Sequence, residues 1–160
     1  MKKIKIESEL EVFDDLKELP QDIQNLMHAA FEARESAYAP YSKFHVGAAI
    51  QLQNGAIVKG SNQENAAYPS GLCAERTAIY YAGANYADQK IKAMAISAKA
   101  QNKETLNPIP PCGACRQAIA EYEVKQEQPI VIYFMGERGA VFKSDSLSNL
   151  LPFLFTQEYL

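Results

Sequence analysis

The placement of the three cysteines constrains this chain more than any other feature of its sequence. Cys73 opens the tetrapeptide Cys-Ala-Glu-Arg, whereas Cys112 and Cys115 form a Cys-x-x-Cys pair that follows a proline much later in the chain. A structural zinc is normally held by four protein ligands, whereas a catalytic zinc takes three and leaves one position open. Three thiols and a neighbouring carboxylate therefore predict a hydrolytic zinc centre, for which the fold must bring both segments to one ion.

Two other interpretations of the cysteines compete with this one. A Cys-x-x-Cys pair that opens a helix is equally typical of a redox site, but the third cysteine favours zinc. His28 or His45 could complete a closed structural site. His28, however, lies off the apolar face of its predicted helix, and His45 lies within a predicted strand, so surface or packing roles are favoured for both.

The residues beside Cys73 suggest how such a centre would work. Cys73 and Cys112 are expected at helix starts, where unpaired N–H groups and the helix dipole favour a thiolate. Glu75, in the first helical turn, could face the same pocket and move protons, although without Cys73 it would be an ordinary first-turn glutamate. Three thiolates leave the zinc site with a net charge of about −1. Arg76 is a candidate to hydrogen-bond a ligand sulfur and offset that charge.

Composition limits the classes of partner. At 160 residues and 48% hydrophobic, the chain fits one ordinary domain. Its net charge of −3, without a basic stripe, disfavours nucleic acid as a partner. No apolar stretch approaches the ~18 residues of a membrane span, and no signal peptide is recognisable. An odd number of cysteines, two of them in a Cys-x-x-Cys pair, favours reduced thiols and a cytoplasmic location.

Hydrophobic periodicity predicts an α/β fold with helices on the faces of a layered sheet. The predicted helices are one after Pro20 that ends before Pro40, one over 73–82 with Gly83 as its stop signal, one from Cys112, and a short one over 146–151. The predicted strands are 44–52, 56–59, 91–98, 129–135 and 140–143, with period-2 alternation adding one over 4–12. Asn54-Gly55 predicts a type I′ hairpin, and 101–111 a loop.

Longer motifs resemble one enzyme family. These are Ala-Tyr-Ala-Pro-Tyr-Ser-Lys-Phe-His-Val-Gly-Ala-Ala at 37–49, Gly-Ser-Asn-Gln-Glu-Asn-Ala-Ala-Tyr-Pro at 60–69, the Cys-Ala-Glu of Cys73, and Pro-Cys-Gly-Ala-Cys-Arg-Gln at 111–117. Together they are similar to the zinc-dependent cytidine deaminases of the short, homotetrameric type, over about residues 22–155. The resemblance implies a three-layer α-β-α domain over 22–160 with a central mixed five-stranded sheet. Residues 1–21 would be an N-terminal extension with a possible extra strand.

The resemblance also implies roles for individual residues. Cys73, Cys112 and Cys115 would bind one zinc ion per subunit, and Glu75 would be the proton shuttle. Asn62 and Glu64 would hold the ribose hydroxyls, Phe44 would pack on the pyrimidine ring, and the Ala74 N–H is a candidate donor to groups at C4. Tyr68 would line a pocket shared between subunits. Phe155, with Phe153 as the alternative, would reach a neighbouring site in the homotetramer.

Residue chemistry alone supports the substrate contacts less strongly, because a polar loop is solvated by default and a strand phenylalanine is more often part of the core. The implied function is hydrolytic deamination of cytidine or 2′-deoxycytidine in pyrimidine salvage. One alternative is deamination of another cytosine-containing small molecule, such as an aminoglycosyl-cytosine antibiotic. A non-enzymatic alternative is a zinc-stabilised binding module. The chain departs from the family pattern in its N-terminal extension, in the longer 101–110 loop and at 153–155.

Overall fold

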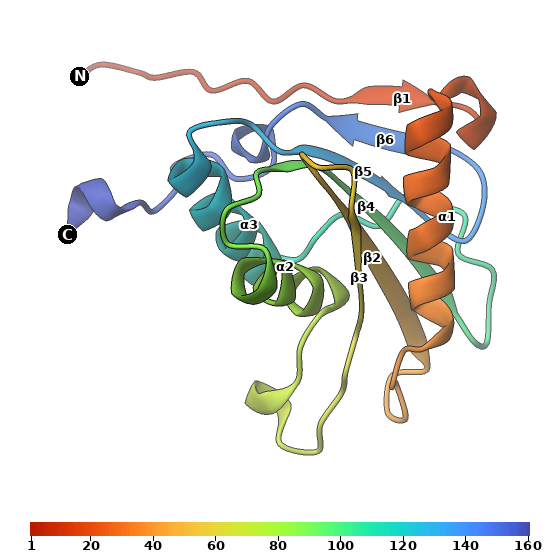
Figure 1. Ribbon diagram of the computed structural model, residues 1–160. Coiled ribbons are helices and arrows are strands. Elements are labelled where there is room, and N and C mark those ends of the chain that lie inside the picture. Colours follow the sequence, from red (N-terminus) through yellow and green to blue (C-terminus); the bar gives the residue numbers. More distant parts are fainter.

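A six-stranded mixed sheet forms the centre of the computed structural model, which describes residues 1–160 (Figure 1). The strands are β1 (Glu11–Phe13), β2 (Phe44–Leu52), β3 (Ile57–Ser61), β4 (Ile91–Ala100), β5 (Val131–Met135) and β6 (Val141–Ser144). Their order across the sheet is β1-β6-β5-β4-β2-β3, and only β4 and β5 run parallel to each other. This confirms the mixed five-stranded sheet with one additional N-terminal strand.

Helices cover both faces of the sheet, as the three-layer prediction requires. Helix α1 (Gln21–Glu35) lies on one face, whereas α2 (Ala74–Asn85) and α3 (Gly113–Gln126) lie on the other (Figure 1). Because side chains alternate along a strand, Ala49 of β2 packs in the core beneath α1, whereas Ile50 packs beneath α2 and α3. None of the helices has the length and apolar character that a membrane span requires.

The N-terminal strand is much shorter than the predicted 4–12. Only Glu11–Phe13 pairs with β6, in a register that sets Glu11 opposite Lys143. The partner strand ends at Ser144, so the preceding residues have no strand to pair with. Leu10 still packs against the core, and the residues before it are exposed and without regular structure.

The turn between β2 and β3 is not the predicted type I′ hairpin. Gly55 has a positive φ of 86°, but Asn54 does not, and a type I′ turn needs positive φ at both central residues. The Gly55 N–H donates to the Leu52 carbonyl, and the Leu52 N–H donates to the Ala56 carbonyl. The Asn54 side chain accepts a hydrogen bond from the Ala56 N–H at 3.0 Å. The connection is therefore a three-residue loop with a glycine bulge.

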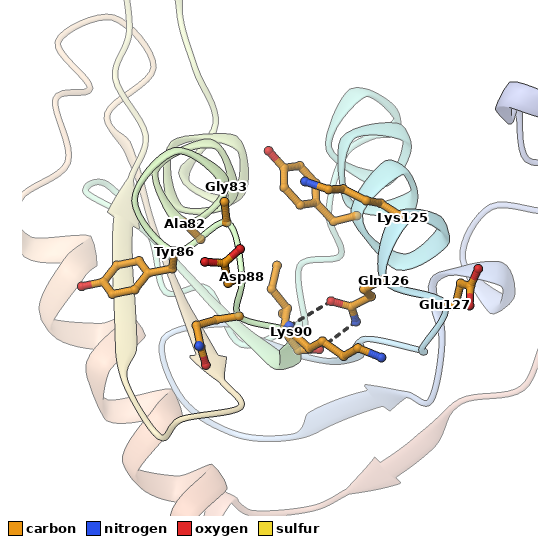
Figure 2. Close-up of a pocket in the computed structure, with 12 residues that line it drawn as sticks. Ala82, Gly83, Tyr86, Asp88, Lys90, Lys125, Gln126 and Glu127 are labelled. Atoms are coloured by element: carbon orange, nitrogen blue, oxygen red, sulfur yellow. Dashed lines mark hydrogen bonds between the residues drawn. The ribbon is translucent and has the colours of Figure 1, made fainter.

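Gly83 does not stop α2, which continues to Asn85. A Cβ atom at Gly83 would lie 2.4 Å from the Tyr122 hydroxyl of α3, so the glycine permits close packing of the two helices. Figure 2 shows this end of the pair, where the Gln126 side chain hydrogen-bonds both the N–H and the C=O of Ile91 at 2.9 Å. A cavity of about 250 Å³ lies here, at the helix ends opposite the cysteines.

Most of the remaining elements differ from prediction only at their ends. β3 and β5 begin one and two residues later than predicted, and the predicted helix over 146–151 is a short 3-10 turn at Leu147–Asn149. The 3-10 turn is anchored on α3, because Glu123 accepts hydrogen bonds from the Leu147 N–H and the Ser146 hydroxyl. This contact brings the C-terminal segment against the helix that carries two of the cysteines.

Candidate metal centre and substrate pocket

The starts of α2 and α3 bring the three cysteine sulfurs together. Cys73 is the N-cap residue of α2, Cys112 is that of α3, and Cys115 lies in the first turns of α3. The Sγ atoms of Cys73 and Cys112 are 3.8 Å apart, those of Cys112 and Cys115 are 3.4 Å apart, and all three lie within 4.8 Å of one another. Two segments that are distant in the sequence thus converge on one point.

The spacing of the sulfurs fits a zinc ion. With Zn–S bonds of about 2.3 Å and tetrahedral angles, ligand sulfurs lie about 3.8 Å apart. The group of candidate ligands contains the three cysteines and neither histidine. His28 is exposed on α1, and His45 lies within β2. Three protein ligands leave one tetrahedral position for water or substrate, which is the arrangement of a catalytic zinc.

The thiols interact strongly with one another in the metal-free chain. The hydrogen bond from Cys115, with a further contribution from Arg76, lowers the pKa of Cys73 to about 5. The same hydrogen bond and burial raise the pKa of Cys115 far above its ordinary value. The cluster therefore readily forms one thiolate but resists a second, because two adjacent negative charges repel each other. A cation at this point would relieve the repulsion and displace the remaining protons.

Glu75 lies beside the sulfurs in the first turn of α2. Its side chain is only 4% exposed, yet it lines the same cavity as Cys73 and Cys112. Burial, assisted by the negative charge on Cys73, raises the pKa of this carboxyl from 4.5 to about 7. A carboxyl with a pKa near neutrality can both accept and release a proton at working pH. The preceding residue, Ala74, is fully buried.

Arg76 contacts the cysteine cluster. Its Nη2 atom lies 3.9 Å from the Cys73 sulfur, which is a long N–H···S hydrogen bond. The Nε atom of the same side chain is buried without a hydrogen-bond partner. The guanidinium therefore places a permanent positive charge against the Cys73 sulfur.

A cavity of about 390 Å³ opens beside the cysteines, and this volume is typical of a small-molecule site. Eight of the residues that the sequence predicts for the site line this cavity: Phe44, Asn62, Glu64, Tyr68, Cys73, Glu75, Arg76 and Cys112. Sequence reasoning missed Tyr41, Ser42, Val46, Gln63, Asn65, Gly71, Leu72, Ile96, Ile109 and Pro110. The sequence could have indicated that Ile109 lines the site, because it is an apolar residue in a proline-rich loop just before the predicted ligand Cys112.

Asn62 and Glu64 are not merely solvated loop residues. The Asn62 side chain accepts a hydrogen bond from the Val46 N–H at 2.8 Å and donates one to the Phe44 carbonyl at 2.9 Å. Glu64 Oε2 accepts hydrogen bonds from the N–H groups of Tyr41 and Ser42, at 2.9 and 3.2 Å. Hydrogen bonds from the Ser42 side chain and from these N–H groups lower the pKa of Glu64, so it is held as a carboxylate.

Both side chains keep hydrogen-bonding capacity after these contacts. An amide can donate twice and accept at two lone pairs, and a carboxylate offers acceptor sites on both oxygens. The backbone contacts fix the orientation of the two side chains on the wall of the cavity, beside the half-buried Phe44. Paired hydroxyl groups of a ligand would therefore meet prearranged partners here.

The C-terminal aromatic residues do not line the cavity of their own chain. Phe153 and Phe155 are 83% and 57% exposed, and Phe155 stacks on Tyr159. Gln117 of α3 donates a hydrogen bond to the Phe155 carbonyl, so this part of the tail is attached to the helix that begins at Cys112. Tyr68, at the rim of the cavity, is 85% exposed.

Comparison with known proteins identifies the group to which this chain is related. Residues 20–131 match the family model of the cytidine and deoxycytidylate deaminase zinc-binding region. The chain is 40% identical to a cytidine deaminase of Halalkalibacterium halodurans, over 86% of this chain and 96% of that protein. It is also 40% identical to a cytidine deaminase of Sporosarcina psychrophila, over 86% of this chain and 93% of that protein.

Solved structures agree with this result. The crystal structure of cytidine deaminase from Burkholderia pseudomallei superposes with a TM-score of 0.70 at 39% identity, covering 82% of this chain and 97% of that one. That of Mycobacterium tuberculosis gives a TM-score of 0.65 at 31% identity, covering 86% of this chain and 99% of that one. With its zinc-binding region matched and its fold shared, the chain belongs to the cytidine and deoxycytidylate deaminase family.

Proposed function

We propose that this chain is a zinc-dependent hydrolase that deaminates cytidine and 2′-deoxycytidine. The products are uridine or 2′-deoxyuridine and ammonia. The observation that carries the proposal is the buried carboxyl of Glu75 next to three converging cysteine sulfurs, at the wall of a cavity of about 390 Å³. A proton-carrying group, an open metal position and room for a nucleoside are the requirements of hydrolytic deamination.

Cys73, Cys112 and Cys115 are the proposed ligands of one zinc ion, which supplies Lewis-acid activation of water. Glu75 accepts one proton from the attacking water and delivers it to ring nitrogen N3. It then takes the second proton of that water from the hydroxyl now on C4 and passes it to the amino group, which leaves as ammonia while the C4 carbonyl forms. In the metal-free chain, burial raises the pKa of this carboxyl to about 7, and the charge of a bound zinc ion would favour the carboxylate form that accepts the first proton. Arg76, against the Cys73 sulfur, offsets part of the negative charge of the thiolates.

The proposed substrate contacts come from β2, from the segment after β3 and from the start of α2. Asn62 and Glu64 hold the ribose hydroxyls with the hydrogen-bonding sites that the backbone contacts leave free. Phe44 packs on the pyrimidine ring, and the Ala74 N–H, at the start of α2, donates to groups at C4. An intact nucleoside is favoured over a free base, because the ribose contacts would otherwise have no partner.

Substitution of Glu75 by Gln tests the proposed proton transfer. The variant keeps the volume and the neutral form of the side chain but cannot carry the proton. It should retain zinc and bind cytidine, but its kcat should fall by about 10²-fold to 10⁴-fold. Cytidine consumption is followed by ultraviolet absorbance, and zinc content is measured on the same samples. A variant within a few-fold of the wild-type rate would refute the assignment.

We also infer a cytoplasmic homotetramer with subunit-shared sites that serves pyrimidine salvage, in which residues 22–160 form the catalytic domain and 1–21 an accessory segment. The exposure of Tyr68 and Phe155 supports shared sites, since both would be buried by a neighbouring subunit. Phe155 is the proposed aromatic contributed to the neighbouring site, with Phe153 as the alternative. The family match begins at residue 20, which supports the accessory role of the preceding segment.

Mixing two inactive variants tests the shared site directly. Glu75→Gln lacks the proton shuttle but keeps Phe155, and Phe155→Ala has the reverse defect. If Phe155 acts in a neighbouring subunit, dissociated and reassembled mixtures should regain activity that neither variant has alone. Mass measurement by light scattering checks that tetramers have formed. Tetrameric mixtures without recovery would exclude Phe155 and direct the same experiment to Phe153.

A further inference from the structure

The loop between β4 and α3 forms one wall of the substrate cavity. Ile109 and Pro110 line the cavity together with Cys112, which follows them in the chain. Residues 101–111 contain no helix or strand, so no regular backbone hydrogen bonds within the loop hold that wall in place. Contacts with the rest of the molecule must hold it.

The turn between β5 and β6 clamps the middle of this loop. The Glu137 N–H donates a hydrogen bond to the Thr105 carbonyl at 2.7 Å. A Cβ atom at Gly136 would lie 2.0 Å from the same carbonyl, so the turn can approach this closely only because residue 136 is glycine. An ion pair between Arg138 and Glu104 adds a further contact at the surface. The two connections that follow the parallel strands β4 and β5 are therefore joined.

Thr105 is also fixed from the strand side. Its hydroxyl accepts a hydrogen bond from the Ala100 N–H at 2.9 Å, and the residue is only 8% exposed. Thr105 thus joins the end of β4 to the turn after β5 through two separate groups. Removal of the hydroxyl would leave the Ala100 N–H without its partner, which is costly where water has little access.

A buried chain of hydrogen bonds holds the β5–β6 turn in place. The Ser97 hydroxyl, which is fully buried, donates to the Gly136 carbonyl at 2.8 Å. The same hydroxyl accepts from Nη1 of Arg34 on α1 at 2.8 Å. Arg34 is 8% exposed, and its guanidinium lies 5.3 Å from the centre of the Phe31 ring. The buried charge of Arg34 is thereby linked, through the Ser97 hydroxyl, to the turn that holds Thr105.

We propose that Thr105 is a positioning residue that sets the Ile109–Pro110 wall of the substrate cavity, with Ser97 and Arg34 as its support. This inference rests on the proposed function. Cys112, the proposed metal ligand that follows this wall, is held separately. Arg116 donates hydrogen bonds to the carbonyls of the adjacent Pro111 and of Leu150, at 2.8 and 2.6 Å. A displaced loop should therefore weaken nucleoside binding and leave the zinc site intact.

Matched substitutions at Thr105 test the proposal. Thr105→Val removes the hydroxyl at nearly constant shape, whereas Thr105→Ser keeps it. Thr105→Val should raise KM for cytidine about tenfold, with kcat and zinc content close to the wild-type values, because a uniform loss of binding acts on KM. Thr105→Ser should restore a KM close to that of the wild type. A KM within twofold of the wild type for Thr105→Val, or an equal rise in both variants, would overturn the inference.

Two further measurements keep the test decisive. Ser97→Ala breaks the same chain of hydrogen bonds away from the cavity and should raise KM in the same direction, even if Thr105→Val does not fold. Amide hydrogen exchange in residues 101–110 should be faster in either variant and unchanged in α2, which takes no part in this chain of hydrogen bonds. Unchanged exchange in this loop would overturn the inference in an active enzyme. Absence of cytidine turnover by the wild-type protein would instead refute the proposed function. The exchange measurement would still test whether Thr105 and Ser97 hold the 101–110 loop.

Discussion

Glu75→Gln should stabilise the metal-free protein, and the gain should depend on pH. In the folded chain, burial raises the pKa of Glu75 from 4.5 to about 7. Between these values the folded state binds more protons than the unfolded state, so stability falls as pH rises. The difference of about 2.5 pH units, at about 1.4 kcal/mol each, gives about 3–3.5 kcal/mol above pH 7. Glutamine has no charge to bury, so the variant avoids this loss.

Urea unfolding at pH 5 and pH 8, with chelator and reductant present, measures this effect. The difference in unfolding free energy between Glu75→Gln and the wild type should be small at pH 5 and approach about 3–3.5 kcal/mol at pH 8. Glu9→Gln is the matched control, because Glu9 is exposed in the N-terminal arm and its replacement should give no such pH dependence. An equal difference at both pH values for Glu75→Gln would refute the argument from burial.

Three other substitutions test separate parts of the account. Arg76→Ala should keep zinc but lower kcat, and an unchanged rate measured beside metal analysis would remove its proposed role. Gly136→Ala should destabilise the fold by about 1–3 kcal/mol in urea unfolding, because the new methyl group would lie 2.0 Å from the backbone carbonyl of Thr105; an unchanged free energy of unfolding would contradict this close approach. Asn62→Ala should lower both stability and nucleoside affinity, seen in unfolding and in KM, whereas a loss of affinity alone would show that its backbone hydrogen bonds contribute little.

The sequence predicted the structure well where a single physical requirement, such as metal binding or burial of one strand face, involves only a few residue types. Three thiols that bind one ion must converge, and the structure brings Cys73, Cys112 and Cys115 within 4.8 Å. Alternating apolar residues predicted β2 at its observed bounds. The contact of Arg76 with a ligand sulfur also followed, because the residue lies one helical turn after Cys73.

The sequence was less informative where a residue acts through distant backbone. Gly83 has the pattern of a helix stop, but its role is set by Tyr122 on another helix. Asn62 could not be assigned its hydrogen bonds to β2 without the fold. Thr105 carries no motif, and its contact with Gly136 depends on the two connections meeting at one edge of the sheet. The proposed contact of Phe155 with a neighbouring subunit lies outside what periodicity within one chain can describe.

Metal analysis combined with cytidine turnover tests the central claim most directly. We expect about one zinc ion per chain on the three cysteines and conversion of cytidine to uridine with release of ammonia. Chelation should abolish turnover, and added zinc should restore it. Tightly bound zinc with no turnover of cytidine, 2′-deoxycytidine or another cytosine compound would contradict the account, as would turnover that survives complete removal of the metal.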